Sequence, residues 1–257
     1  ASDPALLLYT SGTTGRSKGA LISHGALLRH TRNVTTDAVP LSTDDVVLAA
    51  LPFSHSFGCR MVLLACTQTG AKMVMMRRFR ARLAWDILRH AGITWLPVVP
   101  TMLAALVREP DGGGPLPQLR WSLSAGATLP EARRVAASTA LGAPVYQGYG
   151  MTEATFSAID HPPAPPTAGS VGRSIRGVAI RVVDSVGRDA GAGVRGEVWI
   201  RGDNTLLRYL NDPEATAAVL QDGWVRSGDV GVLAQDGQLA IVDRLKDLII
   251  RGGYNVY

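Results

Sequence analysis

The residues best suited to chemistry lie in a loop near the amino end that is rich in glycine and hydroxyl side chains. It spans residues 9–19, YTSGTTGRSKG, and Leu6, Leu7 and Leu8 precede it like a buried strand. Such a loop has little side-chain bulk, so its backbone N–H groups can turn toward an anion while Lys18 donates from the side. Its spacing is not the G-x-x-x-x-G-K-[ST] of a Walker A loop. The segment predicts a phosphate site, with a flexible polar turn as the alternative.

A second segment, QGYGMTE at residues 147–153, follows a short apolar run that is typical of a strand end. Two glycines on either side of Tyr149 allow the backbone to approach a flat or anionic ligand closely. Thr152 beside Glu153 pairs a hydroxyl with a carboxylate, which suits a phosphate oxygen together with Mg²⁺, a cation that prefers oxygen ligands. The alternative is a strand-to-helix turn with a Thr-Glu cap.

Two further segments lie toward the carboxyl end. Asp229 closes the sequence Ser-Gly-Asp, and a carboxylate can accept hydrogen bonds from two adjacent hydroxyls, as a ribose presents them. Taken alone, the tripeptide is typical of a turn. Residues 243–257, DRLKDLIIRGGYNVY, have the pattern of an amphipathic strand followed by a glycine turn.

The order and wording of these four segments resemble the adenylate-forming, or acyl-activating, enzyme superfamily. Residues 243–257 are most similar to those of bacterial medium- and long-chain fatty acyl-CoA ligases. One departure is Ser17, which stands where many members have proline, and it leaves the loop less stiff without removing a phosphate donor. The resemblance implies an acyl-CoA synthetase, which is an acid-thiol ligase. Such an enzyme uses ATP and Mg²⁺ to convert a carboxylic acid, here a fatty acid, to acyl-AMP. CoA then accepts the acyl group.

The resemblance also implies a role for individual residues. Tyr149 would lie near the adenine, Thr152 would contact the α-phosphate, and Glu153 would hold Mg²⁺, so that Lys18 and Glu153 must converge on one triphosphate. Lys246 would be the hinge of a small C-terminal domain, and Gly252 and Gly253 would line the channel for the thiol. The implied nucleotide-binding residues are Thr10, Ser11, Gly12, Thr13, Thr14, Gly15, Lys18, Gly126, Ala127, Gly148, Tyr149, Gly150, Met151, Thr152, Asp229 and Arg244.

Two weaker signals fit the same superfamily. His55, in LPFSHSFG at residues 51–58, matches a histidine that related ligases carry beside the acyl carboxylate and the fatty-acid tunnel. It is a candidate for positioning the substrate and a weaker one for proton transfer; an ordinary, partly buried histidine is the alternative. Gly126 and Ala127 match the loop on which the adenine lies flat, although small residues also suit a turn before a helix. Lys18, Thr152, Glu153 and His55 are thus the candidate catalytic residues.

Composition narrows the class of protein. The chain has 257 residues, of which 46% are hydrophobic and 18% charged, as in globular proteins. Its net charge of +5 is spread along the chain, and the basic cluster at residues 77–80 is more typical of a solvated edge than of a nucleic-acid surface. Cys59 and Cys66 are too few for a disulfide framework. Without a signal peptide or an apolar run of about 20 residues, we expect a cytoplasmic protein with no transmembrane segment and no nucleic-acid partner.

The elements that must position these residues alternate between strands and helices. That alternation predicts a layered α/β fold, followed by a smaller β-rich part after the proline-rich connector at residues 161–166. The expected strands are 46–51, 72–76, 94–99, 119–124, 144–149, 178–184, 196–201 and 238–242, and the expected helices are 81–90 and 131–140. The expected division is an α/β nucleotide- and acyl-binding subdomain at 1–163, a β-rich subdomain at 164–242, and the hinge with the start of a C-terminal domain at 243–257.

The resemblance covers nearly every residue, but members of the superfamily extend further at both ends. We therefore expect a core that binds ATP and turns over poorly, because the lysine that members use on the acyl carboxylate belongs to their C-terminal domain. Two alternatives stay open: acyl or aminoacyl transfer to a carrier protein, and a nucleotide-binding fragment without catalysis. No Asp lies in residues 51–58 or 94–102 to pair a substrate ammonium, which favours a plain carboxylic acid.

Overall fold

A mixed sheet forms the centre of the molecule. The computed structural model describes residues 2–10, 17–244, 249–251 and 254–256. Within these residues the strands of the central sheet have the spatial order β4-β3-β5-β6-β7-β8-β9, and neighbours from β4 to β7 are parallel whereas β8 and β9 are antiparallel. The bounds are β3 Val46–Ala49, β4 Lys72–Met75, β5 Trp95–Val98, β6 Trp121–Ser124, β7 Val145–Tyr149, β8 Ala158–Ile159 and β9 Arg173–Ser174.

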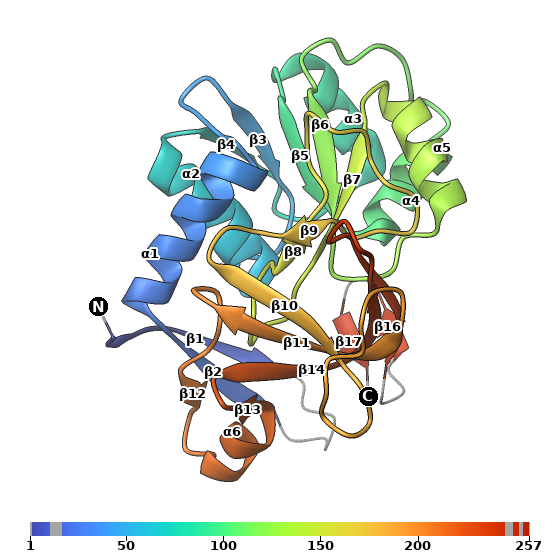
Figure 1. The fold of residues 1–257 in the computed structure, drawn as a ribbon. Coiled ribbons are helices and arrows are strands. Elements are labelled where there is room, and N and C mark those ends of the chain that lie inside the picture. Colours follow the sequence, from blue (N-terminus) through green and yellow to red (C-terminus); the bar gives the residue numbers. More distant parts are fainter. Residues whose placement is uncertain (1, 11–16, 245–248, 252–253, 257) are drawn as a thin grey trace.

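Helices cover both faces of this sheet, as the parallel strands require. Every residue of β5, β6 and β7 is buried. In Figure 1, α1 and α2 lie on the left of the sheet and α4 and α5 on its right. The bounds are α1 His24–Asn33, η1 Val34–Ala38, η2 Phe57–Leu63, α2 Leu64–Thr69, α3 Ala81–His90, α4 Pro100–Arg108 and α5 Glu131–Leu141. The layered α/β fold predicted from the sequence is confirmed, and the five predicted strands of this part agree with β3 to β7 to within two residues at each end.

Aromatic side chains fill part of the core. Trp95 of β5 and Trp121 of β6 have ring centroids 5.7 Å apart, and Trp121 meets Tyr146 of β7 edge to face at 5.8 Å. The indole N–H of Trp85, in α3, donates to the carbonyl of Leu106 in α4 at 3.1 Å. The ring contacts join β5, β6 and β7, and the Trp85 hydrogen bond joins α3 to α4. Large buried rings contribute much of a core's apolar area.

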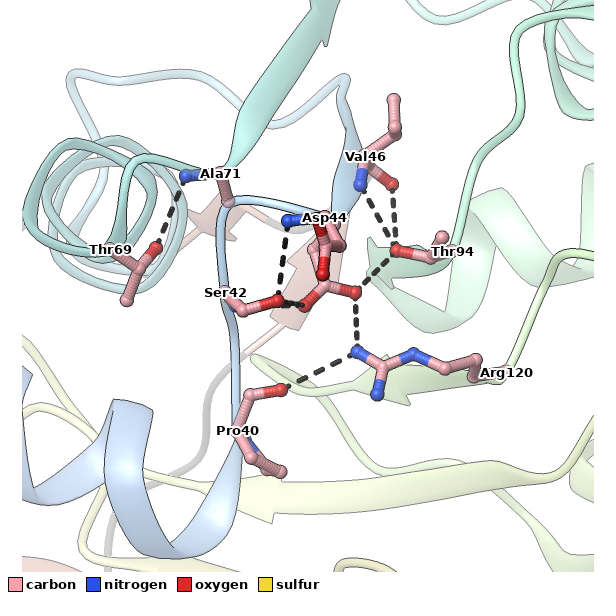
Figure 2. Close-up of polar contacts among 9 residues, drawn as sticks. Pro40, Ser42, Asp44, Val46, Thr69, Ala71, Thr94 and Arg120 are labelled. Atoms are coloured by element: carbon pink, nitrogen blue, oxygen red, sulfur yellow. Dashed lines mark hydrogen bonds and ion pairs between the residues drawn. The ribbon is translucent and has the colours of Figure 1, made fainter.

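A buried carboxylate ties together the amino ends of three strands. Asp45, directly before β3, accepts hydrogen bonds from the Ser42 N–H at 2.9 Å, from the Thr94 hydroxyl at 2.7 Å and from the Arg120 guanidinium at 2.5 Å. Thr94 and Arg120 precede β5 and β6. Figure 2 shows Ser42, Thr94 and Arg120 converging at this point, with the Val46 N–H donating to the Thr94 hydroxyl at 3.1 Å. The amino end of the sheet is thus held by a closed network of polar contacts.

A second, antiparallel sheet follows the proline-rich connector. Its strand order is β10-β11-β14-β13, and β15 also pairs with β14. A smaller sheet joins β1 and β2 at the amino end to β12, and both lie below the central sheet in Figure 1. The bounds are β1 Pro4–Thr10, β2 Lys18–Ser23, β10 Val178–Val183, β11 Arg195–Gly202, β12 Arg208–Tyr209, α6 Pro213–Val219, β13 Leu220–Gln221, β14 Trp224–Leu233, β15 Leu239–Arg244, β16 Ile249–Arg251 and β17 Tyr254–Val256.

Some expectations are refined by the structure. The predicted strand at Leu6–Leu8 exists as part of β1, but only Leu8 is buried and Leu7 is 36% exposed. The reason is that β1 lies at the edge of its small sheet and pairs only with β2. Strand β9 of the central sheet follows the connector at 161–166, and the division of the chain near residue 163 stays a prediction. In the part of the chain that is described, no helix is long and apolar enough to cross a membrane.

Candidate functional site

Three adjoining cavities lie at the carboxyl ends of the parallel strands. Gly126, two residues after the end of β6, lines all three of them. One is polar and has a volume of about 530 Å³, one is apolar with about 270 Å³, and the one between them has about 70 Å³. The order in which successive strands are added to the sheet reverses at β3, because β4 lies on one side of it and β5 on the other. Open α/β sheets bind their ligands at such a switch point.

The polar cavity brings together residues from distant parts of the chain. It lies between the loops after β6 and β7 and the end of β15. Among the residues proposed from the sequence, its walls include Gly126, Ala127, Gly148, Tyr149, Gly150, Asp229 and Arg244. These residues span more than a hundred positions of the sequence, so they form one site only when the chain is folded.

Tyr149, Asp229 and Arg244 form a hydrogen-bonded triad in this cavity. The Tyr149 hydroxyl donates to Oδ2 of Asp229 at 2.7 Å, and Nε of Arg244 lies 2.7 Å from Oδ1. Burial raises the pKa of Asp229, whereas Arg244 and the hydrogen bond from Tyr149 act in the opposite direction. Burial, and then the nearby Asp229, raise the pKa of Tyr149, which keeps its hydroxyl a donor. Each Asp229 oxygen keeps a second lone pair with which it can accept from a ligand hydroxyl.

Glu153 and Lys18 border the same tyrosine. The Tyr209 hydroxyl donates to Oε1 of buried Glu153 at 2.5 Å, and the Lys18 ammonium lies 5.5 Å from the centroid of the Tyr209 ring. Burial raises the pKa of Glu153, while the Tyr209 hydrogen bond and the charge of Lys18 lower it. The two residues that the sequence assigned to one triphosphate are therefore neighbours in space.

Sequence reasoning missed Tyr209. This residue lies in β12, opposite Ala20 of β2, and it is buried. It is 56 positions from Glu153, and its short strand carries no motif that points to a site. The segment before β12 brings the phenol to Glu153, because the Leu206 N–H donates to the Glu153 carbonyl at 2.8 Å and Thr205 forms a β-bridge with Ala154. No local signal could have found this contact.

The small middle cavity brings together two of the four candidate catalytic residues, Thr152 and His55. Thr152, Gly150 and His55 line it, together with Met151 and Arg244. A Cβ on Gly150 would lie 2.3 Å from the backbone nitrogen of Phe156, so this turn requires glycine. The turn is also tied to the His55 segment, because the hydroxyls of Ser56 and Thr155 contact each other.

His55 has a defined tautomer. Its Nδ1 accepts a hydrogen bond from the Phe57 N–H at 3.3 Å, so the neutral imidazole carries its proton on Nε2. Partial burial lowers the pKa of His55, so the neutral ring is favoured near pH 7. The ring lines both the middle and the apolar cavity, and can donate a hydrogen bond where they meet.

Thr10, Lys18 and Glu153 do not line these cavities, and other proposed residues lie outside the described residues. Thr10 and Lys18 face each other in the β1–β2 ladder, where the Thr10 hydroxyl donates to the Lys18 carbonyl at 3.4 Å, and this pairing closes the base of the phosphate loop. The residues outside the described part are Ser11, Gly12, Thr13, Thr14, Gly15, Lys246, Gly252 and Gly253.

Comparisons with known proteins agree with this geometry. A model of the AMP-binding enzyme family matches residues 1–210. The chain is 39% identical to a sulfoacetate–CoA ligase of Cupriavidus necator over 98% of its own length and 50% of that protein. It is 37% identical to an indoleacetate–CoA ligase of Aromatoleum aromaticum, over 99% of this chain and 50% of that protein.

Solved structures show the same fold. The ATP-bound MatB from Rhodopseudomonas palustris superposes with a TM-score of 0.91 at 33% identity, over 100% of this chain and 51% of that one. The chain thus spans about half the length of the curated relatives and solved structures that it matches.

Proposed function

Because the chain belongs to the AMP-binding enzyme family, we propose that its protein activates a carboxylic acid with ATP and transfers the acyl group to CoA. The acid's carboxylate attacks the α-phosphorus of ATP, which forms acyl-AMP and releases pyrophosphate. The CoA thiol then attacks the acyl carbon, and AMP leaves as the thioester forms. The observation that carries the proposal is that a polar and an apolar cavity share Gly126 and that both adjoin a small cavity lined by His55 and Thr152.

The polar cavity is the proposed place of the nucleotide. Tyr149 would lie along the adenine beside Gly126 and Ala127, whose small side chains leave room for a flat base. The Asp229 carboxylate, with Arg244 bound to it, would accept hydrogen bonds from the ribose hydroxyls. Thr152, in the middle cavity, would donate to the α-phosphate.

Charge neutralisation is the main catalytic requirement, because the first step joins two anions. Lys18 and the backbone N–H groups of its loop would bind the phosphates. Glu153 fits Mg²⁺ that arrives with ATP, since this ion is usually held by one or two protein carboxylates and the substrate's phosphates. Among the described residues no cluster of three or more His, Cys, Asp or Glu could hold a metal ion without the nucleotide. When bound, Mg²⁺ would supply positive charge at the phosphate oxygens.

His55 is proposed to position the acid. Its Nε2–H lies on the wall shared by the apolar and the middle cavity, where it can donate to the carboxylate before attack. The sequence predicts a fatty acid as substrate, and we include it in this proposal. Relatives named for acids as different as sulfoacetate and indoleacetate show that family membership leaves the acid open.

The proposal is tested by acid-dependent exchange of pyrophosphate into ATP, measured in the longest natural protein that contains this chain. Loss of one donor to a developing charge costs about 10²–10³ in rate. We expect a loss of that size in Thr152→Ala, whereas Thr139→Ala, on the exposed part of α5, serves as the matched control. Exchange that is equally fast in both variants would refute the role of Thr152. ATP binding without any acid-dependent exchange would instead identify a nucleotide-binding module.

A further inference from the structure

The apolar cavity has walls that are almost wholly hydrocarbon. It lies beyond His55, at the carboxyl ends of β3 and β5, and is lined by side chains from four separate segments. Leu51, Phe57, Phe79, Val99 and Met102 supply the apolar surface. His55 and Thr101 are the polar side chains on its wall within the part of the chain that is described.

From this lining we infer that the acid carries a single charge, its reacting carboxylate, on an uncharged body of about eleven carbon atoms or fewer. The inference rests on the proposed function, since it takes the cavity beside His55 as the seat of the acyl group. Its two parts, charge and size, have separate grounds.

The restriction on charge follows from the absence of any counter-charge. None of the described residues that line the cavity is ionised at neutral pH, because its one titratable side chain is the neutral His55. Arg78 and Arg80 flank Phe79 in the sequence, but they are exposed and do not line the cavity. A second carboxylate or an ammonium would lose its hydration there without gaining a partner, which is strongly unfavourable. Dicarboxylic acids, sulfonated acids and amino acids are therefore excluded as good substrates.

The restriction on size follows from the volume. The cavity has about 270 Å³, and an apolar protein cavity of about 150 Å³ holds one benzene ring. In proportion, the space accommodates about eleven carbon atoms, as a medium-length chain or a ring with a short arm. Gly58 makes one wall rigid, because even a Cβ at this position would lie 2.2 Å from the Pro52 carbonyl oxygen.

The test uses stable acyl-AMP mimics and calorimetry on this chain. The mimics are acylsulfamoyl adenosines made from octanoic acid, from octanedioic acid and from hexadecanoic acid, with sulfamoyl adenosine as the form without an acyl group. We expect the octanoyl mimic to bind at least tenfold more tightly than sulfamoyl adenosine. The octanedioyl mimic has the same length and one more charge, and it should bind at least tenfold more weakly than the octanoyl mimic. The hexadecanoyl mimic should bind no more tightly than the octanoyl mimic.

The outcomes separate the inference from the proposed function. If sulfamoyl adenosine and all three acyl mimics fail to bind, the proposed function fails and the inference falls with it. If the adenosine part binds but the octanedioyl mimic equals the octanoyl one, or the hexadecanoyl mimic binds more tightly still, the nucleotide site stands and the inference about the acid is overturned.

A charge placed on the wall gives a second, independent test. Thr101 lines the cavity at the start of α4 and is exposed, so a longer side chain can be accommodated there. Thr101→Lys should tighten binding of the octanedioyl mimic at least tenfold relative to octanoyl, because its ammonium pairs the second carboxylate. Thr101→Met, of similar length and without charge, should leave the original preference unchanged. An unchanged preference in Thr101→Lys would contradict the placement of the acyl group.

Discussion

The two ends of the central sheet use buried carboxylates in opposite ways. At the amino end, Asp45 is surrounded by donors from Ser42, Thr94 and Arg120, which belong to the same sheet and its connecting loops. At the carboxyl end, Glu153 takes Tyr209 from the small sheet of β1, β2 and β12, and Asp229 of β14 takes Tyr149 from the central sheet. The first arrangement closes on itself and stabilises the fold. The second joins separate sheets and leaves cavities between them, which is what a ligand site needs.

The largest expected effect on stability lies at the amino end. Asp45→Ala leaves the Thr94 hydroxyl and the Ser42 N–H without their acceptor, and should lower the free energy of unfolding by about 3 kcal/mol. Arg120→Met should cost only about 1 kcal/mol, because the Arg120 side chain is 46% exposed. Urea denaturation measures both. Sulfamoyl adenosine should bind to folded Asp45→Ala as tightly as to the unchanged chain. If Asp45→Ala instead kept its stability and lost binding, the assignment of Asp45 to the fold and not to the ligand site would be contradicted.

A histidine behind the site should make stability depend on pH. His30 of α1 is buried, with Nε2 at 3.1 Å from the Phe156 carbonyl, and burial, then Arg60, lower its pKa to about 3. Between pH 6.5 and 5 the unfolded chain takes up a proton here and the folded chain does not, so stability falls as pH falls. The loss over this range is about 2 kcal/mol.

His30→Gln tests this origin of the pH dependence. Glutamine can still donate to the Phe156 carbonyl from a similar position but does not titrate, so the loss of about 2 kcal/mol between pH 6.5 and 5 should disappear. His24→Gln, at the exposed start of the same helix, is the matched control. Thermal melts at half-unit steps of pH measure the difference. A slope that persists in His30→Gln would assign the effect to another group.

At the carboxyl end we expect function to change and stability to hold. Glu153→Gln keeps an oxygen that can accept from Tyr209 and removes a buried charge, so the free energy of unfolding should stay within about 1 kcal/mol. The affinity for ATP in the presence of Mg²⁺ should fall about tenfold, which is ~1.4 kcal/mol. Calorimetry with and without Mg²⁺ is the measurement. An equal loss in both conditions would argue against a metal ligand.

The smallest expected effect is a shift of the pH profile. The Tyr209 hydrogen bond favours the charged form of Glu153, so Tyr209→Phe should raise the pKa of this carboxyl further. Tight binding of Mg²⁺-ATP should then require a higher pH than in the unchanged chain. Calorimetry from pH 5 to 8 follows the shift, and Tyr9→Phe, at an exposed position of β1, is the control. A shift to lower pH would reverse the assigned role of the phenol.

The sequence predicted well what depends on local pattern. Short apolar runs marked β3 to β7 to within two residues at each end, and the helix predicted at 81–90 is α3. Resemblance to the superfamily pointed to Gly126, Tyr149 and Asp229, which share the walls of the polar cavity, and their roles stay a prediction. Patterns of this kind succeed because periodicity and turn chemistry act over a few residues.

What the sequence could not predict depends on residues far apart in the chain. Asp45 and Arg120 are 75 positions apart and meet only because β3, β5 and β6 are neighbours. The contact of Tyr209 with Glu153 has the same origin. The π-helical segment η2, which places Phe57 and Gly58 on the wall of the apolar cavity, has no known sequence signature here. Cavity size likewise follows from packing and not from any motif.

The position of Asp229 links the site to the cooperativity of the whole chain. Its strand, β14, pairs with β11, β13 and β15, and its carboxylate is bonded to Tyr149 of the central sheet. A ligand held by this carboxylate therefore rests on both sheets, and neither sheet can unfold without releasing it. By mass action, each tenfold rise of free ligand above its dissociation constant adds about 1.4 kcal/mol to the cost of melting either part. A ligand bound at the ribose position would thus make the two sheets unfold together as one cooperative unit.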